Sequence, residues 1–502
     1  MQSDWLTFAS EFFTKNYNKM KKILMYALVA SMAIFTSCKK DDDNDVKQGP
    51  KVSAPAASEA LVNATVDVEF SFTAAGGFAS SAVTASNGTA TVKTDGTADA
   101  ASGTIIVSFT GSAAGAGSVT LSVTDKAGLA DDATAVVNVV AEQTTFRINS
   151  NITEDATWET GKIYILESRI AVEPGATLTI QPGVVVKGEA GTGANATVLL
   201  VARGGKLMAE GTADAPIIFT TIADEIIPGQ IESPNLESDV NGLWGGVIVL
   251  GSAKISASNE SGEDVVEVQI EGIPTSDPNG LYGGTNDADN SGVIKYISIR
   301  HGGTNIGSGN EINGLTLGGV GSGTVIENVE VVANQDDGIE WFGGTVNVKN
   351  IVVWNVGDDG LDTDQSWSGT ADNFYVVTVA GHNFELDGPE GSYQAGHTIK
   401  NGTVVASNAD RSAEDLINVD ENSIVTLQNI YITSILEGMK INRVTAVGVV
   451  FDNIMLDVPA ADLANYVNGA VPAGVVAGGS TGADSSVFGW TWASKAGGLT
   501  GL

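Results

Sequence analysis

The sequence predicts an all-β protein made of a small antiparallel β-sandwich followed by a long right-handed parallel β-helix. Three observations lead to this fold class. The 502 residues include 61 glycines and only 17% charged residues, a composition typical of β-rich proteins with many turns. Residues 50–142 alternate apolar and polar positions with a period of two. From about residue 145 onward, short apolar strands recur at intervals of about 22 residues, which indicates a repeat architecture.

The N-terminal segment resembles a bacterial lipoprotein signal. The stretch from Met20 to Cys38, MKKILMYALVASMAIFTSC, begins with two lysines, continues with an apolar run and ends at the sole cysteine after two small residues. We therefore expect residues 1–37 to be a signal region whose true start is Met20, and Cys38 to carry the lipid anchor. The charged, mostly acidic residues 38–49 are expected to form a disordered tether.

Residues 50–142 predict a β-sandwich. The stretch TVDVEFSF places Val66, Val68, Phe70 and Phe72 on one face, and Gly, Ser and Asp turns separate the later strands. The segment VTLSVTDKAGLADDATAVVNVV resembles the closing hairpin of bacterial Ig-like modules. No residue pattern here suggests chemistry, so an Ig-like spacer is the expected role.

The repeat is most regular in the second half of the chain. DDGIEWFGG begins at Asp336 and DDGLDTDQS begins at Asp358, 22 residues later. One β-helical coil of three short strands and three turns fits this length, and equivalent positions then stack about 4.8 Å apart. The interior column is expected to contain Ile339, Leu361, Phe384, Ile417 and Met439. The residues expected to point outward are Glu340, Asp362, Glu385, Asn418 and Lys440.

These intervals assign residues 143–458 to the β-helix. The end of a β-helix exposes unpaired strand edges that need a cover. Residues 459–502 are expected to form that C-terminal cap, because PAADLANYVNGA suits a short helix and VFGWTWASKAGGL is aromatic and apolar. Trp490 and Trp492 are expected to pack within it.

Several segments together resemble a group of β-helical surface lipoproteins found in Bacteroidetes, with the fold of pectin lyases. The segments are GGKLMAEGTADAPIIFTT, LWGGVIVLGSAKI, NDADNSGVIKYISIRHGG, NEINGLTLGGVGSGTVIENVEVV, DDGIEWFGGTVNVKNIVV and FGWTWASKAG. The resemblance covers about residues 145–502. It implies a parallel β-helix on the cell surface, and it implies no established activity.

The acidic turns allow three interpretations. Stacked carboxylates about 5 Å apart repel one another unless they are neutralised. Solvated Asp-Gly turns are one solution, and bound Ca²⁺ is a second, because this cation prefers clustered carboxylate oxygens. The candidate calcium ligands are Asp336, Asp337, Asp358, Asp359 and Asp362, together with Asp287 and Asp289 in the separate loop NDADNSG.

The third interpretation is catalysis, and it rests on a resemblance to polygalacturonases. The motifs NQDDG, VGDDG, AGHNF and MKINR follow one another in the order that those enzymes use. The corresponding catalytic residues would be Asp337, Asp358, Asp359, His382, Lys440 and Arg443. Raised pKa values within such a set would suit glycoside hydrolysis or lysis.

The resemblances to a lipoprotein signal and to the Bacteroidetes surface lipoproteins together imply a lipid-anchored outer-membrane protein exposed on the cell surface. The net charge of −35 disfavours nucleic acid as a partner. We expect binding of polysaccharide or another surface ligand, with Ca²⁺ as a possible structural cofactor and with Glu340, Glu385 and Trp367 as candidate contacts. A polysaccharide lyase or hydrolase, and a purely structural surface element, remain the alternatives.

Overall fold

The computed structural model describes residues 48–306, 312–480 and 482–500. The signal region, Cys38 and all but the last two residues of the predicted tether lie outside these ranges. The chain divides between Glu142 and Gln143 into two compact units.

The first unit is a sandwich of two four-stranded sheets. One sheet has the order β1-β3-β6-β5 and the other has the order β2-β8-β7-β4. The strands are β1 (Lys51–Ser53), β2 (Ser58–Leu61), β3 (Thr65–Thr73), β4 (Phe78–Ser86), β5 (Gly88–Thr94), β6 (Ser102–Gly111), β7 (Gly115–Asp125) and β8 (Ala130–Val140). Alternation along β3 buries Val68, Phe70 and Phe72 in the core between the sheets, as the sequence pattern predicted.

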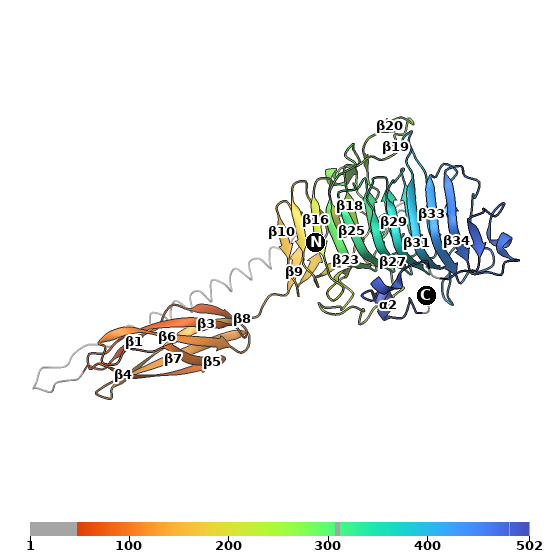
Figure 1. Cartoon of the computed structure of the whole chain (residues 1–502). Helices are drawn as coiled ribbons and strands as arrows, with labels where there is room; N and C mark the ends of the chain where they lie inside the picture. The colour runs from red at the N-terminus through yellow and green to blue at the C-terminus, as the bar shows by residue number, and fades with distance from the viewer. Residues whose placement is uncertain (1–47, 307–311, 481, 501–502) are drawn as a thin grey trace, which may run out of the picture. The chain divides into compact units, whose positions relative to one another are not determined.

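The second unit is a right-handed parallel β-helix (Figure 1). Eight parallel strands form one sheet: β12 (Arg169–Val172), β15 (Val198–Val201), β18 (Val247–Leu250), β24 (Leu315–Gly318), β26 (Ile339–Phe342), β28 (Leu361–Asp364), β30 (Phe384–Leu386) and β32 (Asn418–Val419). The acidic side chains Glu340, Asp362 and Glu385 project from the outer face of this sheet.

A fifteen-stranded sheet forms the rest of each coil. Its strands are β9 (Thr145–Ile148), β10 (Ala156–Trp158), β11 (Ile163–Leu166), β13 (Thr177–Ile180), β14 (Val185–Gly188), β16 (Lys206–Glu210), β17 (Ile217–Thr221), β23 (Gly292–Arg300), β25 (Val325–Val332), β27 (Val348–Trp354), β29 (Thr370–Val377), β31 (His397–Val405), β33 (Val425–Thr433), β34 (Val449–Leu456) and β35 (Val475–Ala477). Aliphatic side chains from both sheets fill the interior.

An asparagine ladder bends the long strands of this sheet. Residues with φ between 52° and 62° recur on successive coils at Asn328, Asn350, Asn373, Asn401, Asn429 and Asn453. Asparagine tolerates this left-handed conformation better than most residues. The Asn350 amide donates to Asn328 Oδ1 at 3.0 Å, and the Asn373 amide donates to Asn350 Oδ1 at 2.8 Å. Asn401 interrupts the series by donating to Asp372 Oδ1 at 2.7 Å, and the ladder then resumes from Asn401 to Asn453.

The predicted interior column is correct for its first four positions and wrong for the fifth. Ile339, Leu361 and Phe384 are paired across β26, β28 and β30, and all are buried. Ile417 pairs with Ile441 instead of Met439. The last coil is two residues longer than predicted, so Met439 is buried at another position and Lys440 does not continue the outward row.

An excursion of the chain covers part of the eight-stranded sheet. It contains the hairpins β19 (Ala257–Ser258) with β20 (Asp264–Val265) and β21 (Val268–Gln269) with β22 (Leu281–Tyr282). The Tyr282 ring lies 6.2 Å from that of Phe342 on the outer face of β26. Isoleucines of the same excursion pack beside them.

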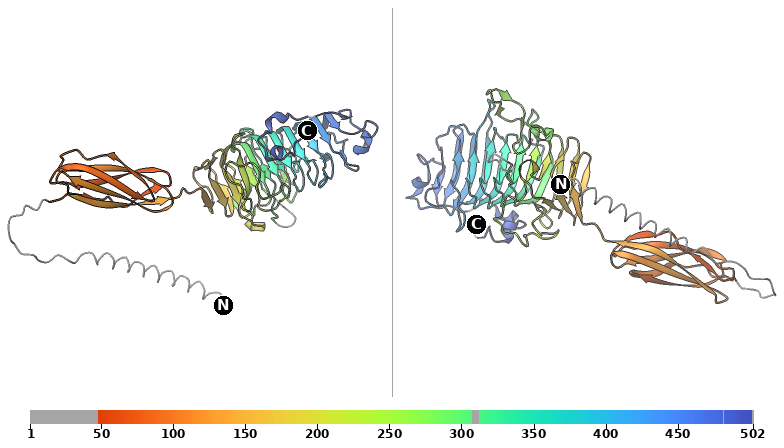
Figure 2. Two further views of the ribbon diagram at one scale, coloured as in Figure 1. Left: turned by 90° about the horizontal axis from the view of Figure 1, so that it is seen from below. Right: turned by 180° about the vertical axis from the view of Figure 1, so that it is seen from behind.

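The C-terminal segment covers less of the β-helix end than predicted. The 3₁₀ helix η3 (Leu463–Tyr466) and Val467 pack against the interior at the end of the coil stack. By contrast, α2 (Trp492–Lys495) and Phe488 lie against the flank of the fifteen-stranded sheet (Figures 1 and 2). The remaining 3₁₀ helices are η1 (Gly193–Asn195), η2 (Pro278–Gly280) and η4 (Ser485–Val487). Trp490 and Trp492 are buried by packing, as expected.

Candidate functional site

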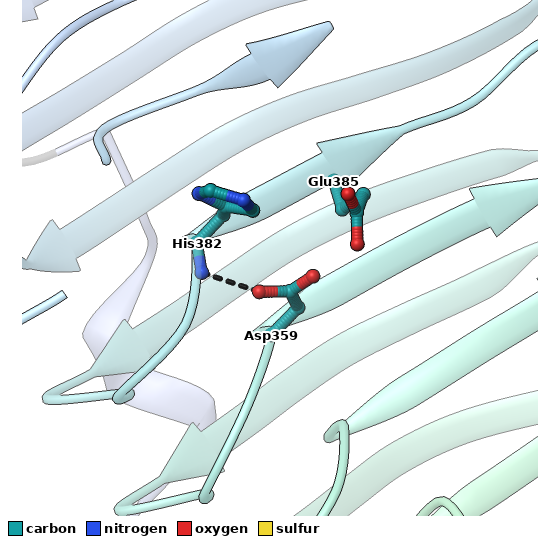
Figure 3. A group of neighbouring side chains, drawn as sticks. All are labelled: Asp359, His382 and Glu385. Atoms are coloured by element: carbon teal, nitrogen blue, oxygen red, sulfur yellow. Dashed lines mark hydrogen bonds between the residues drawn. The ribbon is translucent and has the colours of Figure 1, made fainter. Parts of the chain in front are cut away.

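Asp337, Asp359 and His382 occupy the same place on three successive coils. Each comes two residues before a strand of the eight-stranded sheet, where a glycine or Asn383 links it to the strand. The Asp359 backbone N–H donates to Asp337 Oδ1 at 2.9 Å. The His382 backbone N–H donates in the same way to Asp359 Oδ1 (Figure 3). Each carboxylate therefore holds the backbone of the next coil, and the row is rigid.

The outward row lies beside these turns on the outer face of the sheet. Glu340 pairs with Asp362, Asp362 pairs with Glu385, and Glu385 pairs with Asn418. The register and the outward direction are the predicted ones, but the first two side chains are nevertheless buried. Glu340 is 6% exposed and Asp362 is 8% exposed. The excursion over β26 encloses this part of the face, since Tyr282 reaches across it to bond Gln365 at 3.0 Å.

Three groups of potential metal ligands form where the two rows meet. In each group, the ligand atoms lie within 4.8 Å of one another. The fully buried group is Asp337, Glu340 and Asp362; a second is Asp336, Asp337 and Asp358; the third is Asp359, His382 and Glu385. Figure 3 shows the third group, in which Asp359 lies on one coil and His382 and Glu385 lie on the next.

The buried group has no cationic neighbour to balance it. Within the described part of the chain, no lysine or arginine forms an ion pair with Asp337, Glu340 or Asp362. Burial raises the pKa of all three well above the ordinary carboxylate range, and repulsion from neighbouring carboxylates raises it further. At neutral pH the group must therefore hold protons or a cation.

Three further acids near the buried group also have raised pKa values. Burial, followed by a hydrogen bond with Glu385, raises the pKa of Asp359 to about 11. Burial and repulsion from Asp387 raise the pKa of Asp364 to about 8. Burial and repulsion from Asp420 raise the pKa of Asp387 to about 7. Sequence reasoning missed Asp364 and Asp387, although each follows an outward acid by two residues and so shares its face of the sheet.

His382 connects the acids to a more exposed edge. Its Nε2 lies 3.1 Å from the Asn418 amide, which also donates to Glu385 Oε1 at 3.2 Å. Arg443 Nη1 donates to Asn418 Oδ1 at 2.8 Å and lies 3.3 Å from Asp420. His382, Glu385, Asn418 and Arg443 are all partly accessible. We call these four residues the exposed strip.

The predicted catalytic set is therefore only partly assembled. Asp337, Asp358 and Asp359 lie with His382, and Arg443 reaches the group through Asn418. Lys440 does not join it. Its ammonium group donates to the carbonyl of Asn465 on the following coil, and its backbone N–H donates to Asp415.

The predicted calcium loop at Asp287 and Asp289 is not assembled. Asp287 accepts hydrogen bonds from the backbone N–H and the ammonium group of Lys254, both at 3.1 Å. Asp289 accepts from Ser252 at 2.7 Å and from Ser291 at 3.1 Å. Protein donors thus occupy these carboxylates, and neither belongs to a potential metal group among the described residues.

The expectation that Trp367 contacts a ligand is also wrong. Its ring is 1% exposed and stacks on Trp341 inside the coil, with centroids 4.6 Å apart. The indole N–H donates to the Val346 carbonyl at 3.0 Å. The polar sequence around Trp367 suggested a loop, but the ring turns into the interior and has no free face.

The family comparison supports the β-helix fold. Residues 150–468 match the family described as a pectate-lyase-like β-helix domain. Among solved structures, the chain is similar to a family 28 exopolygalacturonase of Yersinia enterocolitica, with 10% sequence identity over 86% of this chain and 84% of that one, and a TM-score of 0.22. Among curated proteins, none matches the chain.

Proposed function

Because the chain belongs to the family of pectate-lyase-like β-helix domains, we propose that it is a β-helical binding protein of the cell surface. In this proposal, Cys38 anchors it to the outer membrane, and residues 50–142 act as an Ig-like spacer. The β-helix binds a polysaccharide beside its acidic turns, with Ca²⁺ held among the carboxylates. None of the helices in the described residues has the length and apolar character needed to span a bilayer.

One observation carries the proposal, namely the burial of Asp337, Glu340 and Asp362 without a balancing cation. An isolated buried charge costs several kcal/mol or more, so such a group takes up a proton or a counter-ion. Ca²⁺ suits the group because it accepts six to eight oxygen ligands in flexible geometry.

Two unsatisfied oxygens support an ion at this place. Asp362 Oδ1 and Asn313 Oδ1 are buried and have no hydrogen-bond partner among the residues that the structure describes. The amide of Asn313 donates to Glu340 Oε2, so its oxygen lies at the edge of the same group. A buried oxygen without a partner is costly. A cation in the group would bind the Asn313 oxygen directly and remove that cost.

The exposed strip is the proposed ligand contact. His382, Glu385, Asn418 and Arg443 offer donors and acceptors at fixed positions, which is what the hydroxyl and carboxylate groups of a glycan need. An acidic polysaccharide suits it best. Its carboxylates would reach Arg443 and Ca²⁺ at the neighbouring Asp336 and Asp358, which are more accessible than Asp337.

Cleavage of an acidic glycan is the second candidate function. It is favoured by Asp359, His382 and Glu385, which bring a carboxyl group of raised pKa beside an imidazole. Two features count against it. Asp359 is only 2% exposed. In addition, the potential ligand atoms in this group lie within 4.8 Å. This is closer than the carboxyl groups of inverting glycosidases, which are about 6.5–9.5 Å apart to admit water, so the spacing counts against the inverting mechanism although not against a retaining one.

The test uses polygalacturonate with the purified mature chain. We expect the polymer to be retained in Ca²⁺, to be released by a chelator, and to remain uncut. The double variant Asp358→Asn plus Asp359→Asn should lose retention, while Glu421→Gln, an exposed control, should keep it. Oligosaccharide release that disappears in the double variant would establish the enzyme instead. Retention that ignores both chelator and variant would refute the calcium-dependent site.

A further inference from the structure

Three excursions of the chain meet at one hollow outside the acidic turns. Most coils are short, but residues 222–246 separate β17 from β18, and residues 406–417 separate β31 from β32. The chain after β35 also returns to the flank of the fifteen-stranded sheet. Together they enclose a cavity of about 520 Å³ at the ends of β27, β29 and β31. A volume of this size is within the usual range for small-molecule sites.

The floor of the cavity is apolar and tightly built. It is formed by Trp354, Val377 and Val405, the last residues of the three strands. Asn355 and Thr378 continue two of these strands and bond to each other, and the Asn355 amide donates to the Ser238 carbonyl at 3.1 Å. The strand ends are therefore tied to the first excursion, so the hollow has a fixed floor and wall.

Arg411 supplies unused donors at the wall. Its Nη1 donates to the carbonyls of Asn355 and Val356 at 2.8 and 2.6 Å. Among the described residues, its Nε and Nη2 donate to no acceptor, and no carboxylate pairs with it. Asn408 holds the loop in place by accepting from the backbone of Asp410 and Arg411, both at 2.8 Å. The guanidinium is thus held by one nitrogen, and its other N–H groups remain available.

The charges around Arg411 define the class of ligand. Glu237, Asp239 and Asp410 line the same cavity and are exposed. Three carboxylates against one guanidinium disfavour phosphate, sulfate and uronate. An apolar floor beside a mixture of hydrogen-bond donors and acceptors suits a ring that has hydroxyl groups at its edge and C–H groups on its face.

We propose that this cavity is a binding site for a neutral saccharide unit of a glycan chain. The unit lies over the ends of β27, β29 and β31, and its hydroxyl groups accept from Arg411 and donate to the rim carboxylates. The site is separate from the calcium group and needs no cation. The inference rests on the proposed polysaccharide binding and extends it to neutral sugars. The cavity lies close to the acidic turns along the chain, because Asn355 in its lining precedes Asp358 by only three residues on the same coil.

The test measures binding of neutral hexose and pentose oligosaccharides to the full mature chain by calorimetry, with a chelator present. Ala496→Trp should fill the cavity, because Ala496 lines it from an exposed position. We expect at least a tenfold loss of affinity. Lys495→Trp, which places the same ring next to the cavity but outside its lining, should bind within about twofold of the parent.

Arg411→Met tests the recognition step, and we expect it to lose at least tenfold as well. Asp410→Asn should lose less, because a neutral hydroxyl still finds a partner in the amide. Equal affinity in Ala496→Trp and the parent, or no binding by any neutral oligosaccharide, would overturn the inference. A ligand lost with Asp410→Asn but kept with Arg411→Met would be cationic and would overturn it too. Binding in chelator by a chain that takes up no Ca²⁺ would refute only the calcium proposal.

Discussion

At the scale of single residues, the main determinant of the site is how each carboxylate is neutralised. Glu340 and Asp362 are separated from water by the excursion that contains Tyr282, and no lysine or arginine in the described ranges forms an ion pair with them. Protons and added cations should therefore compete for Glu340 and Asp362, because both bind the same carboxylate oxygens.

Replacing Glu340 by Gln should change stability in opposite directions with and without Ca²⁺. In chelator at pH 8, Gln needs neither the proton nor the cation that the buried carboxylate must take up on folding, so the free energy of unfolding should rise by about 1–2 kcal/mol. In saturating Ca²⁺, loss of a ligand should lower it by a similar amount. Chemical denaturation of Glu340→Gln and of the exposed control Glu421→Gln checks this. An identical shift in both conditions would mean that Glu340 contacts no ion.

The pH dependence follows from the raised pKa values of Asp364 and Asp387, about 8 and about 7. The unfolded chain ionises these groups near pH 4, while the folded chain keeps them protonated until pH 7–8. The folded state then binds more protons, so stability falls as pH rises from about 4 to about 8. In chelator, we expect the melting temperature to decrease steadily across this window. A constant or rising value would contradict the assignment of protonated acids.

At the scale of elements, the coils depend on the interior column and on the asparagine ladder. Leu361 is fully buried between Ile339 and Phe384. Leu361→Asp should therefore cost about 4 kcal/mol or more, because it places a charge where no partner exists. Leu361→Met conserves volume and should cost less than about 1.5 kcal/mol. Urea unfolding compares the two, and a normally stable Asp variant would refute the column.

The asparagine ladder makes a separate prediction. Asn350→Ala loses two amide hydrogen bonds and retains a φ of 59°, which an alanine side chain disfavours. We expect a loss of about 1–3 kcal/mol. Asn350→Gly should lose less, since glycine adopts this conformation freely. If both variants unfold at the same denaturant concentration, the backbone conformation contributes nothing to the difference.

The elements also show what the sequence could and could not predict. Intervals of 22 and 23 residues identified Ile339, Leu361 and Phe384 as one column, because register follows directly from coil length. They failed at Met439, where the coil gains two residues, and such a change has no periodic signal. The burial of Glu340 depends on an excursion whose path over β26 is a tertiary property. The prediction that Trp367 contacts a ligand failed for a similar reason. Its polar neighbours indicate a turn, but they do not indicate the direction in which its ring points.

At the scale of the whole molecule, the proposed anchor and spacer would hold the β-helix away from the membrane. The prediction at Cys38 is direct, because the chain has no other cysteine. Cys38→Ala should move the protein from the membrane fraction to the soluble fraction, since the lipid would have no attachment point. Persistence of the variant in the membrane fraction would refute the lipoprotein anchor.

The central claim is that the buried carboxylates hold a divalent cation, and thermal unfolding with and without Ca²⁺ tests it most directly. A ligand at 100 times its Kd stabilises the folded state by about 2.7 kcal/mol, which corresponds to a rise of about 3–4 °C for a unit of this size. We predict this rise in Ca²⁺ at pH 8, a smaller one in Mg²⁺, and little at pH 5, where protons occupy the oxygens. The rise should disappear in Glu340→Gln plus Asp362→Asn. Equal melting temperatures in Ca²⁺ and chelator at pH 8 would contradict the claim and leave protonated acids as the account of this face.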